Sequence, residues 1–216
     1  VTKTITDFNT SELIKFDVVL RHSKLLSAID ATDPSITSSS VIPRIAKYFT
    51  PTTGTSNSYN VYFNNSIYNP HDGHNSAMGG VITSTGFYVS GEFNTNEQFF
   101  DDDGKGNIRL YYLTGATRNY TDITAGTVDY KTGKVSINTL NILSISNIDG
   151  AASTRIRIVA LPNSNDIVAL RNQILEIDVT NTKILGGIDT IAVGDEAGAV
   201  TFDATPSTVD PTGTSY

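Results

Sequence analysis

The chain has 216 residues, which is enough for one large domain or two small ones around a buried core. Its formal net charge of −7 excludes a protein that binds nucleic acid through a basic surface, and no stretch approaches the roughly 18 apolar residues of a membrane span. The absence of cysteine excludes disulfides and thiol chemistry, and because only 17% of the residues are charged, the surface is polar mainly through Ser, Thr and Asn.

The first predicted elements are a strand and a short helix. In IKFDVVL, residues 14–20, apolar side chains alternate along the chain and predict a strand. In residues 21–34 the period changes, because Leu25, Leu26 and Ile29 recur at helical spacing until Asp33-Pro34 ends the run. This stretch is the best predicted helix in the sequence.

From residue 35 onward the pattern predicts strands and turns. Short runs of alternating residues are bounded by Gly, Asn, Asp or Pro, and strands that recur about every ten residues are typical of a sandwich or a folded antiparallel sheet. The predicted fold class is therefore mainly β (α+β), with antiparallel sheets or a sandwich and one short N-terminal helical segment. The predicted strands lie in residues 41–49, 59–63, 86–93, 107–113, 127–130, 134–145, 154–161, 172–179 and 189–194.

The sequence predicts three segments along the chain. Residues 1–34 form a strand-and-helix segment, residues 35–195 form a β-rich body, and residues 196–216 form a flexible C-terminal tail. The tail ends in TPSTVDPTGTSY, which contains two prolines and almost no apolar residues. Such a composition cannot bury enough surface to offset the entropy of ordering, so we expect disorder from about Pro206 onward in the isolated chain.

The stretch QFFDDDGKGNIRLYY, residues 98–112, is the first candidate site. An EF-hand loop beginning at Asp101 would place Gly106 at the required sixth position. However, Lys105 and Tyr112 would occupy the fifth and twelfth positions, where the loop needs calcium ligands. Glycines beside Asp and Lys tolerate positive φ, so the stretch predicts a hairpin turn between paired strands. An irregular calcium site stays open as the alternative, because adjacent carboxylates attract hard cations.

The stretch GTVDYKTGKV, residues 126–135, is similar to a phosphate-binding loop. The motif needs four residues between its glycines and a Ser or Thr after its Lys. Here six residues separate Gly126 from Gly133, and Val135 follows Lys134. The stretch also lacks a helix whose N-terminus could face a phosphate. It predicts a strand, a turn and a strand, and excludes nucleotide binding.

The stretch HDGH, residues 71–74, combines imidazole and carboxylate groups. His71, Asp72 and His74 could contribute to a zinc or iron site, but the only other histidine is His22 and no second cluster completes the ligand shell. The favoured interpretation is a solvated loop. His71, Asp72 and His74 remain weak metal candidates, and no cofactor is predicted.

No pattern in the sequence indicates catalysis. There is no G-x-S-x-G motif, and the histidines stand in no recognisable catalytic context. A glycosidase could draw paired carboxylates from distant strands, and Glu92, Glu97 and Glu176 are the first candidates, although each fits a surface acid. We therefore predict no catalytic residue and no enzyme activity.

Four stretches occur together and in order between residues 21 and 178. They are RHSKLLSAIDATDPSITSS, DDDGKGNIRLYYL, GTVDYKTGKVSI and PNSNDIVALRNQILEID. Together they resemble the baseplate wedge proteins of large contractile-tailed phages, related to the baseplate J-like proteins. The resemblance covers the C-terminal portion of such a protein. It implies that a longer upstream part is missing, in keeping with a chain that does not begin with Met.

The resemblance implies a structural role in the virion, in the tail baseplate, after assembly in the host cytoplasm. Its members look like scaffold subunits that pair with copies of themselves and with other wedge proteins, without nucleic acid or membrane. The stretch after Pro162 offers donors and amide groups suited to such a contact, and Arg is enriched where interfaces carry their energy. The predicted interface residues are Asn165, Asp166, Arg171, Asn172 and Gln173.

A second hypothesis from another class is a carbohydrate-binding or depolymerising β-domain of a phage tail or a bacterial surface protein. Such modules present aromatic side chains on which sugar rings stack. The chain offers ten tyrosines for this purpose but no tryptophan.

Overall fold

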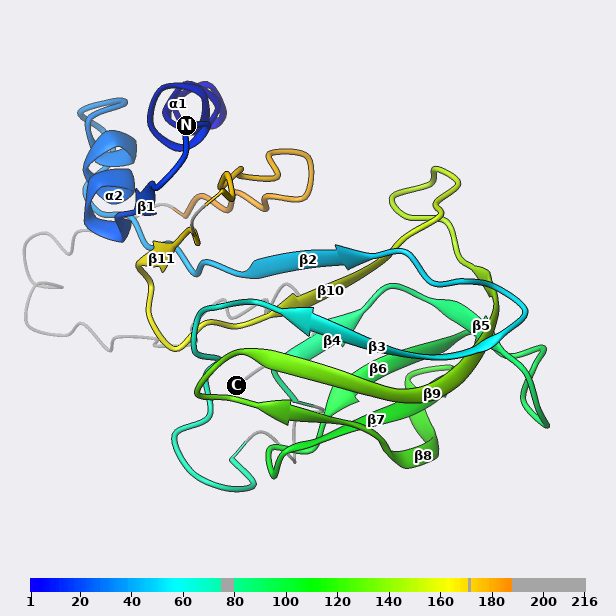
Figure 1. The fold of residues 1–216 in the computed structure, drawn as a ribbon. Coiled ribbons are helices and arrows are strands. Elements are labelled where there is room, and N and C mark those ends of the chain that lie inside the picture. The colour runs from blue at the N-terminus through cyan, green and yellow to red at the C-terminus, as the bar shows by residue number, and fades with distance from the viewer. Residues whose placement is uncertain (75–79, 171, 188–216) are drawn as a thin grey trace, which may run out of the picture.

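The computed structural model describes residues 1–74, 80–170 and 172–187. Two helices and an adjoining strand pair form a small unit beside a larger β body (Figure 1). The strands pair antiparallel throughout the described residues, which confirms the predicted fold class. The predicted strand at 189–194 and the predicted tail lie outside the described residues, and the division at residues 34 and 195 stays a prediction.

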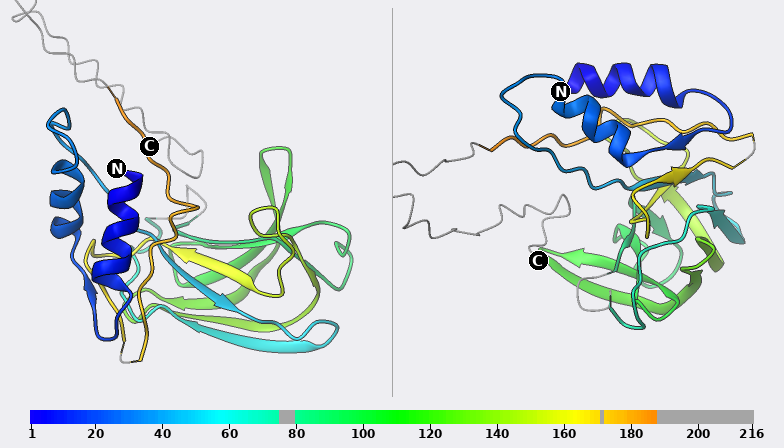
Figure 2. Two further views of the ribbon diagram at one scale, coloured as in Figure 1. Left: turned by 90° about the horizontal axis from the view of Figure 1, so that it is seen from above. Right: turned by 90° about the vertical axis from the view of Figure 1, so that its left-hand side faces the viewer.

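The helical unit begins with a helix that the sequence analysis did not predict. Helix α1 (Thr2–Phe8) continues into a π-helical turn, η1 (Asn9–Leu13), and lies beside α2 (His22–Asp30), the predicted helix (Figure 2). Thr and Ile are β-branched and lower the helix propensity of residues 2–8. Packing overrides this preference, because apolar side chains of α1, η1 and α2 form one buried cluster: Ile5, Phe8, Leu13, Leu25 and Ile29.

The predicted strand at residues 14–20 is mostly wrong. Only β1 (Val19–Leu20) is a strand, and Phe16 forms an isolated bridge with Ile174. Asp17 has a φ of 57°, in the left-handed region, which interrupts the extended chain. The alternation misled because Ile14 and Phe16 face solvent, while the neighbouring Leu13 is the buried residue.

The chain returns to the helical unit after the β body. Strand β11 (Ile167–Val168) pairs with β1, and beyond it Leu175, Ile177 and Val179 pack against the helical cluster. The amide of Ile177 donates to Asn9 Oδ1 at 2.8 Å. Residues 172–179 were predicted as a strand, but they are held by side-chain packing and by this contact, with one bridge at Ile174.

The β body confirms most of the predicted strands. A nine-stranded antiparallel sheet folds around one hydrophobic cluster. Within it, the pairings β5–β6, β6–β7, β7–β8, β8–β9 and β9–β5 form a closed ring, so this part of the sheet closes on itself. Its strands are β2 (Ile45–Phe49), β3 (Ser56–Tyr62), β4 (Ile82–Ser84), β5 (Phe87–Val89), β6 (Gln98–Asp102), β7 (Asn107–Thr114), β8 (Thr117–Asp129), β9 (Lys134–Ile145) and β10 (Ile156–Ala160).

The remaining strands extend the sheet outward from the ring. β4 pairs with β6, β10 pairs with β4, and β2 pairs with β10 at one end of the sheet. β3 pairs with β9. The interior is mainly apolar, and the side chains of Phe87, Phe100, Ile108 and Ile142 are among the most completely buried. The ring therefore encloses a packed core.

Candidate functional site

The candidate calcium stretch is a hairpin, as predicted. β6 and β7 pair in register, with Phe100 opposite Leu110. Gly104 and Gly106 have φ of 72° and 105°, which the turn requires and side chains other than glycine rarely adopt. Asp103 Oδ1 accepts hydrogen bonds from the backbone amides of Lys105 and Asn107 at 2.7 and 2.9 Å. The turn itself therefore uses only the third of the three aspartates.

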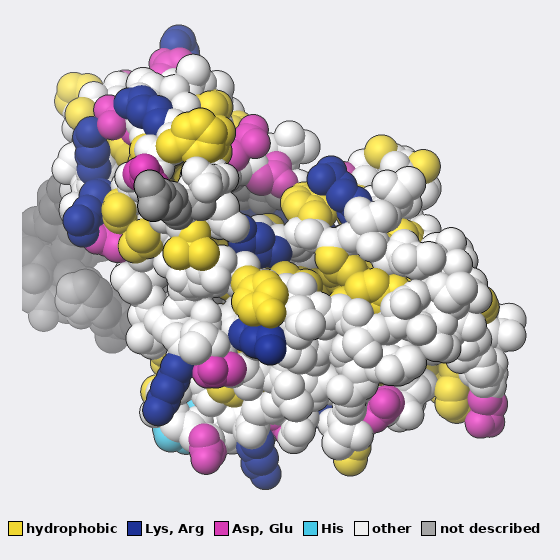
Figure 3. Space-filling view, viewed as in Figure 1, with side chains coloured by type: hydrophobic (Ala, Val, Ile, Leu, Met, Phe, Trp, Pro, Cys, Tyr) yellow, Lys and Arg dark blue, Asp and Glu magenta, His cyan; other side chains and the backbone are white. Residues whose placement is uncertain are grey.

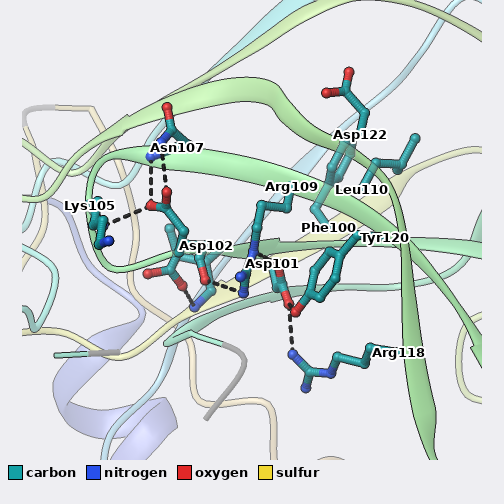
Figure 4. A network of polar contacts seen from close by, with 12 residues as sticks. Phe100, Asp101, Asp102, Lys105, Asn107, Arg109, Leu110, Arg118, Tyr120 and Asp122 are labelled. Carbon is teal, nitrogen blue, oxygen red and sulfur yellow. Dashed lines mark hydrogen bonds and ion pairs between the residues drawn. The ribbon is translucent and has the colours of Figure 1, made fainter. Parts of the chain in front are cut away.

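Asp101 lies on the outer face of β6 and is fully buried there by side chains from β7 and β8. Its Oδ1 accepts from Arg109 Nε at 2.8 Å, and its Oδ2 accepts from Arg118 Nη1 at 2.7 Å and from the Tyr120 hydroxyl at 2.9 Å (Figure 4). Burial raises the pKa of Asp101, and the hydrogen bond from Arg109 opposes that shift. Burial also raises the pKa of Tyr120, which keeps its hydroxyl protonated as a donor.

Aromatic rings cover this ion-pair cluster. The guanidinium of Arg109 lies 4.3 Å from the centre of the Tyr120 ring, and that of Arg118 lies 4.8 Å from the centre of Tyr111. Both are cation–π distances. Asp101 is fully buried, and its ion pairs with Arg109 and Arg118 join β6, β7 and β8 on the outer side of the sheet.

Asp102 points the opposite way, into the body. Its Oδ1 accepts from the amides of Val81 and Ile82 at 2.7 and 2.8 Å, and its Oδ2 accepts from the Tyr130 hydroxyl at 2.6 Å. Burial, followed by the charge of Asp102, raises the pKa of Tyr130 and keeps it a donor. Asp102 thereby joins β6 to β4 and to the residue after β8.

The three aspartates do not converge on a common point. Successive strand residues face opposite sides of the sheet, so Asp101 and Asp102 diverge, and Asp103 turns back to the loop. Every carboxylate oxygen of the three accepts at least one hydrogen bond from the protein. The buried roles of Asp101 and Asp102 were not predicted from the sequence. The signal was present, because period-two alternation after Phe100 already separates them.

The candidate phosphate loop is also a turn, as predicted. It joins β8 to β9, and Gly133 has a φ of 69°. The carboxylate of Asp129 accepts from the amides of Lys131 and Thr132 and from the Thr132 hydroxyl, so these donors are directed inward to the turn.

The structure brings together two of the three metal candidates. His74 Nδ1 and His71 Nε2 are 3.0 Å apart, and the rings meet edge to face. Asp72 contacts His71 only through its backbone carbonyl, at 3.3 Å from Nδ1. Within the described residues, no group of three or more His, Asp or Glu side chains is placed to hold a metal ion.

Of the glycosidase candidates, Glu92 and Glu97 lie in the connection between β5 and β6, whereas Glu176 lies in the segment after β11. Glu92 and Glu176 are exposed. Glu97 is partly buried and borders an open surface pocket of about 280 Å³, together with Asn96, Phe99, Tyr112, Leu113 and Thr114. Glu97 is the one acid among these lining residues, whereas a glycosidase needs two carboxylates across the bond that it cleaves.

The predicted interface residues lie in the turn before β11 and in the loop after it. Asp166 accepts from the backbone amide of His22 at 2.9 Å and from Arg21 at 2.8 Å, so it caps the start of α2 from a distant part of the chain. Gln173 Oε1 accepts from Lys47 Nζ at 3.1 Å. Asn165 and Asn172 are exposed. Arg171 lies outside the described residues.

An exposed apolar surface lies beside these residues. Phe16 forms a bridge with Ile174. Val168 pairs with Val19 in the two-stranded ribbon of β1 and β11, and Leu170 follows two residues later. We define the ribbon patch as these four residues: Phe16, Val168, Leu170 and Ile174. Each of their side chains is at least two-fifths exposed. Hydrophobic side chains are visible at the surface around β1 and β11 (Figure 3). Alternation of apolar residues predicts a face buried on a core, so the sequence did not indicate that this patch is exposed.

The buried carboxylates of Asp101 and Asp102 thus join strands of the β body, whereas the ribbon patch lies at its surface. None of the helices in the described part of the chain is long and apolar enough to cross a membrane.

Residues 1–48 match the family model of a phage baseplate structural protein, described as baseplate structural protein gp6, C-terminal domain III. The match covers α1, η1, β1, α2 and the first four residues of β2. It confirms the predicted resemblance to the C-terminal portion of a baseplate wedge protein. This family has a structural role in the baseplate and places the protein in the virion tail baseplate. None of the curated proteins compared with the chain matches it.

Proposed function

We propose that this chain is a structural subunit of the baseplate wedge that assembles with copies of itself and with other wedge proteins, and that it catalyses no reaction. One observation carries the proposal. The segment that matches the baseplate family contains α1, α2 and β1. Strand β1 pairs with β11 to form the two-stranded ribbon, which carries the exposed ribbon patch.

The ribbon patch is suited to burial against another protein. Phe16 is 63% exposed, and its neighbours across the ribbon are also large and apolar. A two-stranded ribbon is only marginally stable by itself, so covering one face would stabilise it. Full burial of a Phe side chain contributes about 1.5 to 3 kcal/mol. A two-fold contact between two copies is the commonest closed arrangement. In such a contact the same side chains of the patch would be buried on both copies.

The polar residues of the predicted interface would frame this contact. In this proposal Asn165 and Asn172 offer amide groups to a partner, and Asp166 holds the turn against α2. Gln173 fixes the loop to β2 through Lys47. Arg171 completes the proposed set, as predicted from the sequence.

Sedimentation velocity from low to high micromolar concentration tests self-association. We expect association that Phe16→Ser weakens by at least about tenfold, the equivalent of 1.4 kcal/mol. Ile123→Ser is the matched control, because Ile123 on β8 is 64% exposed and lies outside the ribbon patch. A strict monomer, or equal effects of the two variants, would contradict self-pairing through this surface.

The absence of catalysis is tested separately. The chain should turn over no substrate in a panel for glycosidases, esterases and phosphatases. Turnover that disappears in Glu97→Gln or His71→Ala would contradict the structural proposal.

The carbohydrate-binding alternative has one observation in its favour. The rings of Phe93 and Tyr112 stack with their centres 5.4 Å apart, and Tyr112 borders the pocket that contains Glu97. Stacked aromatic side chains beside polar groups are suited to a sugar ring. A glycan array decides the matter: specific binding lost in Tyr112→Ala would favour this alternative over the wedge subunit.

A further inference from the structure

β2 and β3 are edge strands that follow one another in the chain and are joined by residues 50–55. Among the described residues, β2 pairs only with β10 and β3 pairs only with β9. No backbone hydrogen bond is found between β2 and β3. Each strand therefore presents a row of unpaired N–H and C=O groups, the usual template for pairing with another chain.

The two edges do not pair with each other, and we call the interval between them, beside the hydrophobic core, the opening. Near the connecting loop they are close, because the rings of Phe49 and Tyr59 lie 5.0 Å apart. On β10 the core-facing residues are fully buried, whereas their direct partners on β2 are only partly buried. Hydrophobic side chains are visible at the surface between β2 and β3 (Figure 3). The core is thus incompletely covered at this edge.

Lys47 occupies a core-facing position at the opening. The register places it opposite Ile158, which is fully buried, and between Ile45 and Phe49 on the same face of β2. Its amine donates to the neutral Gln173 Oε1 at 3.1 Å, and no described carboxylate forms an ion pair with it. Burial lowers the pKa of Lys47, as expected for an ammonium group that has lost water without gaining an opposite charge.

We propose that the opening between β2 and β3 binds an extended strand from another polypeptide, with alternate apolar side chains on the core and one carboxylate on Lys47. The backbone edges would supply affinity and the core-facing side chains specificity, as in other cases of strand addition. The proposal rests on the proposed function, because another baseplate subunit would provide the strand.

Charge complementarity selects this occupant. The chain carries a net charge of −7, so its surface as a whole does not attract acidic partners. Lys47 is a local exception, since a carboxylate beside it would form a charge-assisted hydrogen bond in a partly dehydrated place. The occupant should therefore be an apolar strand with a single acid, rather than a generally acidic peptide.

Hydrogen exchange on the intact chain, with a synthetic peptide as the probe, tests the proposal. The peptide alternates valine and threonine and carries glutamate in place of one valine. It should slow amide exchange in β2 and β3. Lys47→Met, or glutamine in place of the peptide glutamate, should weaken binding about tenfold. Lys131→Met in the β8–β9 turn is the control and should leave binding unchanged. An unchanged melting temperature of Lys47→Met confirms that β2 stays folded.

Several results would overturn the proposal. One is that the peptide protects neither edge, and another is that it binds Lys47→Met as well as the unaltered chain. A third is that the edges are already protected without peptide. If dilution removes that protection, a second copy occupies the opening, and if deletion of residues 188–216 removes it, the chain's own C-terminal segment does. The peptide assay is run below the concentration at which the chain self-associates, so the two proposals are tested independently. A peptide that does not bind would not contradict the proposed role as a wedge subunit. A chain that stays monomeric would not contradict strand binding at β2 and β3.

Discussion

Replacing Asp101 with Asn should destabilise the β body strongly. Asp101 is 0% exposed, while the side chains of Arg109 and Arg118 are 13% and 28% exposed. Removing one partner of a buried ion pair costs about 3 to 5 kcal/mol, because the remaining charge stays buried without compensation. Water reaches Arg118 in part, so we expect the lower end, about 3 kcal/mol. For a chain of this length, that is a fall in melting temperature of roughly 6 to 12 °C.

Urea unfolding followed by circular dichroism measures this loss, and the dependence on urea concentration should keep its slope. Asp122→Asn is the control: Asp122 is exposed on the neighbouring strand β8, so its replacement should change stability by less than about 0.5 kcal/mol. Combining Asp101→Asn with Arg118→Met should cost less than the sum of the two single changes, because both remove the same contact. A loss below about 1 kcal/mol for Asp101→Asn, or full additivity, would refute the reasoning.

Further predictions concern turns, pH and calcium. Gly133→Ala should cost at least twice the roughly 1 kcal/mol expected for Gly54→Ala in urea unfolding. Both have positive φ, but only at Gly133 would a methyl group clash with a backbone carbonyl, that of Asn65; equal losses would contradict this. The hydrogen bonds from the His22 amide and from Arg21 lower the pKa of Asp166. The stabilisation by Asp166 is therefore present above the ordinary Asp pKa and is lost as pH falls through its pKa in the folded protein. Asp166→Asn should therefore flatten the acid limb of stability against pH, and an unchanged limb would count against this link. Millimolar calcium in place of EDTA should leave the melting temperature unchanged; a rise that disappears in Asp103→Asn would reveal a calcium site.

Local chemistry was sufficient to predict the turns and one helix. A tight reversal between two strands requires the glycines of the hairpin stretch, whatever residues surround the turn. The helical spacing of Leu25 and Ile29 likewise identified α2 without reference to other elements. The same reasoning failed at α1 and at residues 14–20. There, packing against α2 and the returning segment around Ile177 decided the conformation, against local propensity.

The sequence by itself determined that this protein is an antiparallel β protein with tight Gly turns, and that its three candidate motifs lack the spacing or the ligands of known sites. Only the tertiary structure decided which carboxylates are buried and which apolar residues are exposed. Asp101 meets Arg118 because β7 lies between β6 and β8, and Asp166 meets Arg21 across 145 residues of chain. Periodicity specifies which face of an element a residue occupies, but whether that face is buried depends on the strand or helix that the folded chain places against it.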